Sequence, residues 1–364
     1  MKVTQHICRQ VETMTGPIVW SFYRANRLLL EASNLVIGMV FDANKDIILV
    51  TGGSSGLGKE IVSAFHIKGA KVVVFDIDIP DSGTDNYVEG VHYYPCDVSD
   101  CQQVREKAAE VIKDVGIVSI LVNNAGMTTG DSILNLSFER IEKTMSVNLL
   151  SSFYTIKTFL PDMLEQKRGY IVTIASTLGY MSPARLSAYG ASKSGLIALH
   201  ESLTYELGSP TLNTTGVKTL LICPGQLKTR MFEGVRTPST LFAPELDPKD
   251  VAQRVLKSVT YGCRGEIKMP FYGNFLPVFR SVPWPLVAMM RYVSGIDTSM
   301  KQFVDQTKEA GKISSAFISE KASLMSSIFA SKSRLSGIAE EISVEPSESH
   351  IEPFAEDPIG FTKG

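Results

Sequence analysis

Residues 46–68 read DIILVTGGSSGLGKEIVSAFHIK, and the order of residue types in this stretch decides the fold. A short apolar run leads into a glycine-rich turn, and apolar residues at helical spacing follow. This order predicts a dinucleotide-binding unit, because glycines let a pyrophosphate approach the backbone and the helix N-terminus offers free N–H donors. A flexible Gly/Ser loop is the alternative, which both flanks disfavour. The turn residues expected to contact the cofactor are Gly52, Ser54, Ser55, Gly56, Leu57 and Gly58.

Asp76 ends a second apolar strand, at residues 71–75. A carboxylate in this place accepts hydrogen bonds from ribose hydroxyls and repels a 2′-phosphate. Asp78 adds negative charge nearby, and residues 53–57 contain no Arg or Lys. The sequence therefore favours NAD over NADP, while an acid that simply ends a strand is the alternative for Asp76.

Tyr189 and Lys193 are four residues apart, so on a helix they lie on one face, one turn apart. A nearby ammonium favours the phenolate and is expected to lower the pKa of Tyr189 from about 10. A phenol tuned in this way can exchange a proton with an alcohol or carbonyl oxygen. Taken alone, the spacing is more typical of a surface tyrosine beside a solvated lysine. Ser176, which follows the apolar run 170–175, favours the catalytic interpretation.

In this order and spacing, the motifs resemble those of the short-chain dehydrogenase/reductase superfamily over roughly residues 45–270. The resemblance implies an α/β fold, a single Rossmann-type doubly wound parallel sheet with helices on both faces, plus an N-terminal helix and a C-terminal extension. It implies catalytic roles for Asn148, Ser176, Tyr189 and Lys193, with Tyr189 and Lys193 also contacting the cofactor. The further cofactor contacts that it implies are Asp97, Val98, Asn124, Ala125, Gly126, Pro224, Gly225 and Thr229.

The implied reaction is hydride transfer at a carbinol carbon. Tyr189 would be the general acid/base, and Ser176 would hydrogen-bond the reacting oxygen. Lys193 would bond the nicotinamide ribose, and Asn148 would hold a water that links Lys193 to solvent.

The segments LPDMLEQKRGYIVTIAS, YGASKSGLIALHESLTYEL and KMPFYGNFLPVF are similar to the retinol dehydrogenase and 17-beta-hydroxysteroid dehydrogenase branch. The expected substrate is therefore a lipophilic alcohol or its carbonyl: a retinoid, a steroid or a long-chain lipid. Apolar side chains in residues 226–246 suit such a substrate. The alternatives are an NAD-sensing scaffold without turnover and an NADPH-dependent ketoacyl or ketone reductase.

Charge and composition exclude other classes of function. The net charge is −2 and no basic stripe is present, which argues against a nucleic-acid partner. The five histidines are scattered and the five cysteines form no CxxC pair, so no metal site is predicted.

The chain is longer than one such domain needs. Residues 1–44 are expected to hold an amphipathic helix at 17–36, which either lies on a membrane or packs on the protein's own core. Residues 45–270 form the catalytic domain. Residues 271–331 are read as a cap over the substrate cleft or a membrane contact, and the acidic residues 332–364 as a disordered tail.

Location follows from the resemblance together with the amphipathic stretch 17–36 and the aromatic segment 271–292, and assembly follows from the resemblance. We expect an intracellular protein associated monotopically with the endoplasmic reticulum membrane or with lipid droplets, on the cytosolic side, and mitochondria remain an alternative. A homodimer through the helices that carry Asn148 and Tyr189 is a further expectation.

Overall fold

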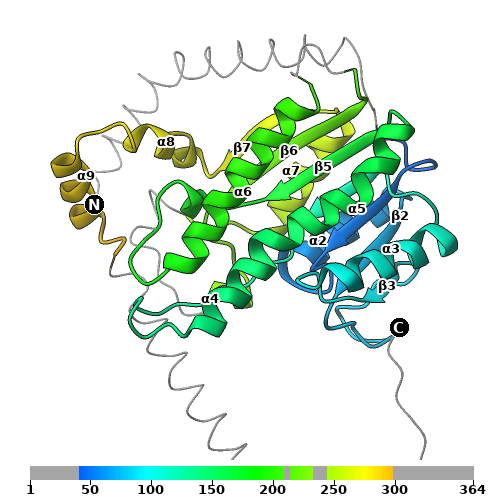
Figure 1. Cartoon of the computed structure of the whole chain (residues 1–364), viewed down its shortest axis with the longest axis horizontal. Helices are drawn as coiled ribbons and strands as arrows, with labels where there is room; N and C mark the ends of the chain where they lie inside the picture. The colour runs from blue at the N-terminus through cyan, green and yellow to red at the C-terminus, as the bar shows by residue number, and fades with distance from the viewer. Residues whose placement is uncertain (1–40, 209–213, 233–243, 298–364) are drawn as a thin grey trace, which may run out of the picture. The chain divides into compact units, whose positions relative to one another are not determined.

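The computed structural model describes residues 41–208, 214–232 and 244–297. Within them the chain forms a parallel sheet of seven strands in the order β3-β2-β1-β4-β5-β6-β7 (Figure 1). The strands are β1 (Ile47–Thr51), β2 (Lys71–Asp76), β3 (His92–Pro95), β4 (Ile120–Asn123), β5 (Gly169–Ile174), β6 (Val217–Pro224) and β7 (Gly265–Met269). The doubly wound fold predicted from the sequence is confirmed.

Helices alternate with the strands. They are α2 (Gly56–Ile67), α3 (Cys101–Asp114), α4 (Phe138–Met145), α5 (Ser151–Glu165), α6 (Ser187–Glu206), α7 (Pro248–Thr260), α8 (Leu276–Phe279) and α9 (Trp284–Ser294). A π-helical turn at Ser146–Leu150 joins α4 to α5, and single 3₁₀ turns lie at Thr177–Gly179, Arg230–Phe232 and Phe271–Asn274.

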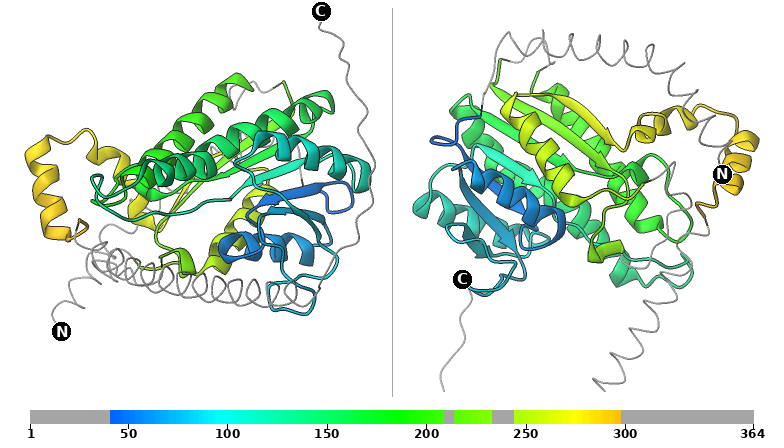
Figure 2. Two further views of the ribbon diagram at one scale, coloured as in Figure 1. Left: turned by 60° about the horizontal axis from the view of Figure 1, so that its bottom comes forward. Right: turned by 180° about the vertical axis from the view of Figure 1, so that it is seen from behind.

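The central strands are mostly apolar and buried along their whole length because both faces of the sheet are covered. All residues of β1, β5 and β6 are buried. On one face the sheet packs against α2 and α7, and on the other against α3, α5 and α6 (Figures 1 and 2). Strand order reverses between β1 and β4, and ligands of such folds bind in the crevice outside the carboxyl ends of the strands at this point.

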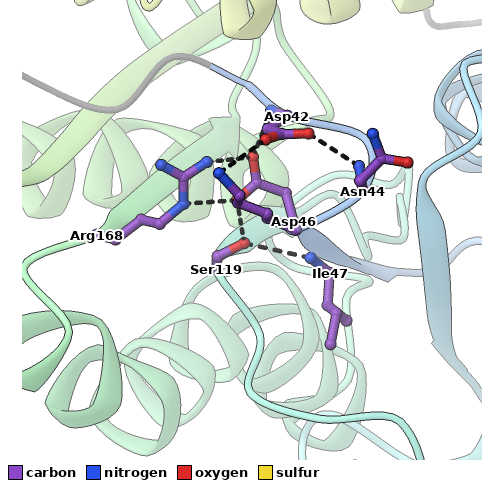
Figure 3. A network of polar contacts seen from close by, with 7 residues as sticks. Asp42, Asn44, Asp46, Ile47, Ser119 and Arg168 are labelled. Carbon is purple, nitrogen blue, oxygen red and sulfur yellow. Dashed lines mark hydrogen bonds and ion pairs between the residues drawn. The ribbon is translucent and has the colours of Figure 1, made fainter.

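A buried charge network joins the amino-terminal ends of β1, β4 and β5 (Figure 3). The Asp46 carboxylate is 1% exposed and accepts two hydrogen bonds from the Arg168 guanidinium, at 3.0 and 2.8 Å. It also accepts from the Ser119 hydroxyl at 2.8 Å and from the Asp42 backbone N–H at 2.7 Å. The Ser119 hydroxyl in turn accepts from the Ile47 N–H. The network holds these three central strands together at their amino-terminal ends.

After β7 the chain forms two short helices, α8 and α9, as prolines at 277, 283 and 285 require. No residue of α9 is buried, and several of its large apolar side chains are exposed. Among the helices of the described ranges, none combines the length and apolar character needed to cross a membrane.

Three predicted features lie outside the described residues, namely the helix at 17–36, residues 298–331 of the extension and the tail at 332–364. The domain boundaries drawn from the sequence therefore stay predictions.

Candidate active site

A cleft of about 870 Å³ opens at the carboxyl ends of the strands. It brings together most residues that the sequence singles out. Those that line it are Gly52, Ser55, Gly56, Leu57, Asp76, Asp97, Val98, Asn124, Ala125, Gly126, Ser176, Tyr189, Lys193, Pro224, Gly225 and Thr229. Ser54, Gly58 and Asn148 do not line the cleft and contribute from behind it.

Two glycines shape the turn, one by its backbone conformation and one by a close approach of helix to strand. Gly52 has φ +64°, in the left-handed region that favours glycine. A Cβ on Gly58 would lie 2.0 Å from the carbonyl oxygen of Gly52, so α2 could not start this close to β1 with any other residue. Gly58 therefore shapes the turn.

The N-terminus of α2 faces the cleft without a side-chain cap. Ser55 at the N-cap makes no capping hydrogen bond, and the first turn contains no acidic residue. By contrast, α3 and α7 begin with Asp100 and Asp247, whose carboxylates accept backbone N–H bonds. The first N–H groups of α2 are thus available to an anionic ligand such as a pyrophosphate.

Asp76 lies at the end of β2, on the wall of the cleft. Its carboxylate accepts a hydrogen bond from the Ser54 N–H at 2.9 Å and one from the Asp78 N–H at 3.3 Å. A carboxylate has about four lone-pair sites, so acceptor capacity remains for ligand hydroxyls.

Asn124 braces the turn from β4. Its side-chain amide donates to the carbonyls of Thr51 and Gly52, both at 3.0 Å. The Thr51 hydroxyl accepts from the N–H groups of Asn124 and Ala125. These contacts fix residues 123–126 against the glycine turn.

Asp97 is bound by Lys143 on α4, a residue that no sequence pattern singles out. The two side chains form an ion pair at 2.8 Å, and Ser99 also donates to the carboxylate. Burial alone would raise the pKa of Asp97, but the bonds from Lys143 and Ser99 hold it below its ordinary value. The partners are 46 positions apart, and no spacing rule links them.

Ser176, Tyr189 and Lys193 lie on one wall of the cleft and are all buried. The Ser176 hydroxyl accepts from the Leu178 N–H at 3.1 Å. The Lys193 ammonium donates to the carbonyl of Ile174 at 3.0 Å, and its nitrogen lies 5.9 Å from the centroid of the Tyr189 ring.

The electrostatics of this group differ from the sequence-based expectation. Burial raises the pKa of Tyr189 to about 12, although a hydrogen bond with Ser176 opposes the rise. Burial also lowers the pKa of Lys193 to about 8. The expected lowering of the tyrosine pKa by Lys193 is therefore wrong for this geometry, because desolvation raises the pKa of the phenol by more than the Ser176 hydrogen bond lowers it.

Asn148 lies in the π-helical turn between α4 and α5, and is 1% exposed. Its side-chain oxygen accepts from the Met127 N–H, and its nitrogen donates to the Met127 carbonyl and to the Ser192 hydroxyl. The Ser192 hydroxyl donates to the carbonyl of Tyr189. Asn148 thus connects the wall of the cleft to α6 through a serine to which the sequence assigned no role.

The cleft continues past Tyr189 into apolar surroundings. Phe232 stands edge-on to the Tyr189 ring, with centroids 5.8 Å apart. Met127, Val147 and Met231 also line the cleft. Of these, Phe232 and Met231 belong to the segment 226–246 that the sequence predicts to suit a lipophilic substrate, whereas Met127 and Val147 had no recognisable signal.

Comparison with known proteins extends these observations. The family profile described as short chain dehydrogenase matches residues 46–239. An uncharacterized oxidoreductase of Saccharomyces cerevisiae is 34% identical over 68% of this chain and 82% of its own. Human retinol dehydrogenase 10 is 32% identical over 82% of this chain and 94% of its own.

A solved structure of a short-chain dehydrogenase from Streptomyces avermitilis superimposes with a TM-score of 0.56 at 25% identity, covering 69% of this chain and 99% of that one. The fold of this family binds NAD or NADP. A chain that matches named dehydrogenases over most of their length, and that gathers their motifs around one cleft, belongs to the short-chain dehydrogenase/reductase family of oxidoreductases, in its retinol dehydrogenase-like branch.

Proposed function

We propose that this protein is an NAD-dependent dehydrogenase that interconverts a lipophilic alcohol and its carbonyl, with Tyr189 as general acid/base. The observation that carries the proposal is the shared cleft: Ser176, Tyr189 and Lys193 line the same cavity as the glycine turn and Asp76. A scaffold that only senses the dinucleotide has no need of a buried serine and a buried tyrosine in the cleft that binds it.

The residues present fit a nicotinamide dinucleotide. The uncapped start of α2 suits the pyrophosphate, and Asp76 has acceptor capacity for ribose hydroxyls. When bound, the nicotinamide would supply the hydride acceptor or donor, and the protein would place and polarise the substrate.

The chain's own residues would manage the proton. With a pKa near 12 the Tyr189 phenol keeps its proton at neutral pH, which suits donation to a carbonyl oxygen. Taking a proton from an alcohol requires positive charge beside the phenol, and Lys193 is protonated below about pH 8. The Ser176 hydroxyl would hydrogen-bond the reacting oxygen, and Asn148 would hold a water that leads to Lys193.

An apolar substrate is supported by the surroundings of Tyr189. Phe232 and Leu186 pack against it, and neither offers a partner to a sugar or a phosphate. Relatives named retinol dehydrogenase 10 favour a retinoid, although steroids and long-chain alcohols have the same apolar character.

NAD rather than NADP is supported by Asp76, which would repel a 2′-phosphate. Cations also line the cleft, among them Lys59. Its ammonium, however, donates to the Asp85 carbonyl and the Asn86 side chain.

The direct test is turnover by purified full-length protein, followed as NADH absorbance with retinol, steroid alcohols and long-chain alcohols, and in reverse with their carbonyls. We expect activity on at least one class, and a loss of about 10²–10⁴-fold in Tyr189→Phe. Tyr205→Phe, on the exposed end of α6, is the matched control. Binding of NAD by the wild type without turnover of any substrate would establish the scaffold alternative.

Association with the endoplasmic reticulum or lipid droplets remains part of the proposal. Trp284, Tyr292 and Val293 of α9 are more than three-quarters exposed, which suits contact with lipid. Flotation with liposomes should carry the full chain upward and should weaken when Trp284 and Val293 are changed to Ser. A full chain that stays at the bottom with neutral and anionic lipids contradicts this.

A homodimer is also proposed. On α6, Leu196 and Leu203 are buried in the protein's own core, so they are not dimer contacts. Leu150 and Phe153, next to Asn148, are 38% and 40% exposed and could meet a second copy. Sedimentation equilibrium should give twice the chain mass, and Phe153→Glu should shift it to the monomer.

A further inference from the structure

The loop at residues 177–186 joins Ser176 to the helix that carries Tyr189, and so sets where these two side chains stand relative to each other. We call it the connecting loop. Its regular structure is limited to one 3₁₀ turn at Thr177–Gly179. The helix that follows, α6, begins at Ser187, and its N-cap residue Leu186 makes no side-chain capping bond. The loop therefore depends on contacts from other parts of the chain.

One sign of this dependence is Arg185, which has φ +69°. A non-glycine residue in this left-handed region is strained and persists where the surrounding structure holds it. The Arg185 carbonyl accepts from the Asp131 N–H at 3.0 Å, which fixes one end of the loop.

Within the loop, the Ser182 hydroxyl donates to the Leu186 carbonyl, and Ser194 of α6 donates to the Gly179 carbonyl. Further contacts to the loop backbone come from the C-terminal arm, which we define as residues 270–297. Arg280, just after α8, donates from Nε to the Tyr180 carbonyl at 2.9 Å and from Nη2 to the Gly179 carbonyl at 3.2 Å. A planar guanidinium that bonds two successive carbonyls fixes the direction of the peptide between them.

A second contact comes from the end of α9. Arg291 donates to the Ser182 carbonyl at 3.0 Å and forms an ion pair with Asp297. The same Asp297 carboxylate accepts from the Ala184 N–H at 2.9 Å. The Arg291–Asp297 ion pair therefore binds the loop backbone at two points, the Ser182 carbonyl and the Ala184 N–H.

The base of the arm packs against Gly225, which lines the cleft. The Gly225 N–H donates to the Met269 carbonyl at 2.6 Å, immediately before the arm. A Cβ on Gly273 would lie 3.1 Å from Cγ2 of Thr177, the residue after Ser176. The Tyr180 hydroxyl also donates to Glu266 on β7. The arm thus begins in contact with the cleft and reaches back to the loop.

We propose that Arg280, Arg291 and Asp297 are positioning residues that clamp the connecting loop and thereby hold Ser176 and Tyr189 at their working separation. This inference rests on the proposed roles of Ser176 and Tyr189. None of the three residues lines the cleft, so they act through the loop backbone. Displacement of a reacting group by about 1 Å can cost on the order of 100-fold in rate, which makes such a clamp matter for turnover.

The first readout is hydrogen exchange of the full-length protein, which needs no activity. In Asp297→Ala the Ala184 amide loses its acceptor, and we expect it to exchange about tenfold faster, the factor that corresponds to one net hydrogen bond. Arg280→Met should speed exchange across the loop in the same way. The matched control is Arg105→Met, on the exposed face of α3 far from the loop in sequence and fold.

The second readout separates turnover from cofactor binding. We expect kcat to fall roughly 10- to 100-fold in Arg280→Met and Asp297→Ala, while the Kd for NADH stays within about twofold. Arg280→Lys retains the charge and should recover part of the loss. Unchanged loop exchange with unchanged kcat in both variants overturns the proposal, as does an equal loss in Arg105→Met.

Hydrogen exchange and turnover together distinguish a failure of the clamp from a failure of the proposed function. If exchange of the loop accelerates while the wild type turns over no alcohol or carbonyl, the proposed function is wrong and the clamp stands. Suppose instead that the wild type is active and that both variants keep its kcat although their loop amides exchange faster. The three residues then clamp the loop without positioning the catalytic pair, and the proposal is wrong.

Discussion

The two ends of the sheet differ in how far hydrogen bonds compensate a buried charge. At the amino-terminal end, the Asp46 carboxylate is surrounded by donors: a bidentate guanidinium, a hydroxyl and a backbone N–H (Figure 3). At the carboxyl end, the Lys193 ammonium is equally buried, and its hydrogen bond goes to the Ile174 carbonyl. Burial lowers the pKa of this lysine to about 8.

The difference separates stability from chemistry. A buried charge with its hydrogen bonds satisfied supports the fold, whereas a poorly compensated one costs stability and is typical of functional sites. The comparison makes opposite predictions for the two ends: changes at Asp46 should unfold the protein and spare catalysis, and changes at Lys193 should do the reverse.

The largest expected effect is on turnover at the carboxyl end. Lys193→Met removes the charge beside Tyr189, and we expect kcat to fall by about 10³-fold or more, within the range for loss of acid–base assistance. Stopped assays of NADH formation measure it. Lys218→Met provides a control, because Lys218 is also buried but bonds the Gly262 carbonyl away from the cleft. An equal fall in both variants would remove the distinction between the two ends.

Asp46→Ala should have the largest effect on folding. It leaves the Arg168 guanidinium half-buried with its main partner removed, and breaking a buried pair in this way costs about 3–5 kcal/mol. Urea unfolding measures the loss, and kcat of the folded fraction should stay unchanged.

The matched control for this change is Asp42→Ala. The Asp42 side chain pairs with the exposed Lys45, and its backbone N–H, which bonds Asp46, is retained. Exposed pairs contribute about 0–1 kcal/mol, so this variant should be nearly as stable as the wild type. A similar loss in both variants would mean that the bonds of the Asp46 carboxylate to Arg168 and Ser119, drawn in Figure 3, are not what carries the stability.

The carboxyl end was largely predictable from the sequence, and the amino end was not. Glycines, an i, i+4 pair and an acid at a strand end are local patterns with a physical reason, and they located the turn, Asp76 and the Tyr189–Lys193 pair. The bond between Asp46 and Arg168 spans 122 positions, and no local pattern connects them. The same holds for Lys143 and Asp97, and for Arg280 at the connecting loop.

Burial was the second quantity that local pattern could not supply. The i, i+4 spacing correctly placed Tyr189 and Lys193 on one helix, but the direction of the tyrosine pKa depends on how deeply the surrounding residues enclose the ring. Similarly, Leu196 and Leu203 lie on a helix from which the sequence leads us to expect dimer contacts, and only packing assigned them to the core.

A smaller effect is expected at Asp76, which ends β2, whereas Asp46 directly precedes β1. Unlike Asp46, it has spare acceptor capacity facing the cleft, so Asp76→Ala should leave stability within about 1 kcal/mol. We expect the preference for NADH over NADPH to fall roughly tenfold or more, because the repulsion of a 2′-phosphate disappears. Fluorescence titration with both nucleotides measures this, and tighter binding of NADPH by the wild type would contradict the assignment of NAD.

The smallest expected effect is a gain in stability from Lys193→Met, and its pH dependence identifies its cause. The folded-state pKa of Lys193 is lowered from 10.5 to about 8, so below pH 8 both states bind the proton and the folded state bears the full cost, about 3 kcal/mol. Loss of a partner for the Ile174 carbonyl costs about 1–3 kcal/mol in the variant, which leaves a net gain of about 0–2 kcal/mol at pH 7. Between pH 8 and 10.5 the unfolded state holds a proton that the folded state has released, so the wild type gains stability and the advantage of the variant should shrink and then reverse. Urea unfolding of nucleotide-free wild type and variant at pH 7 and 10 measures this difference, in which Lys218, with its own pKa near 8, cancels. A gain that is the same at both pH values would mean that Lys193 destabilises the fold by its shape rather than by its charge.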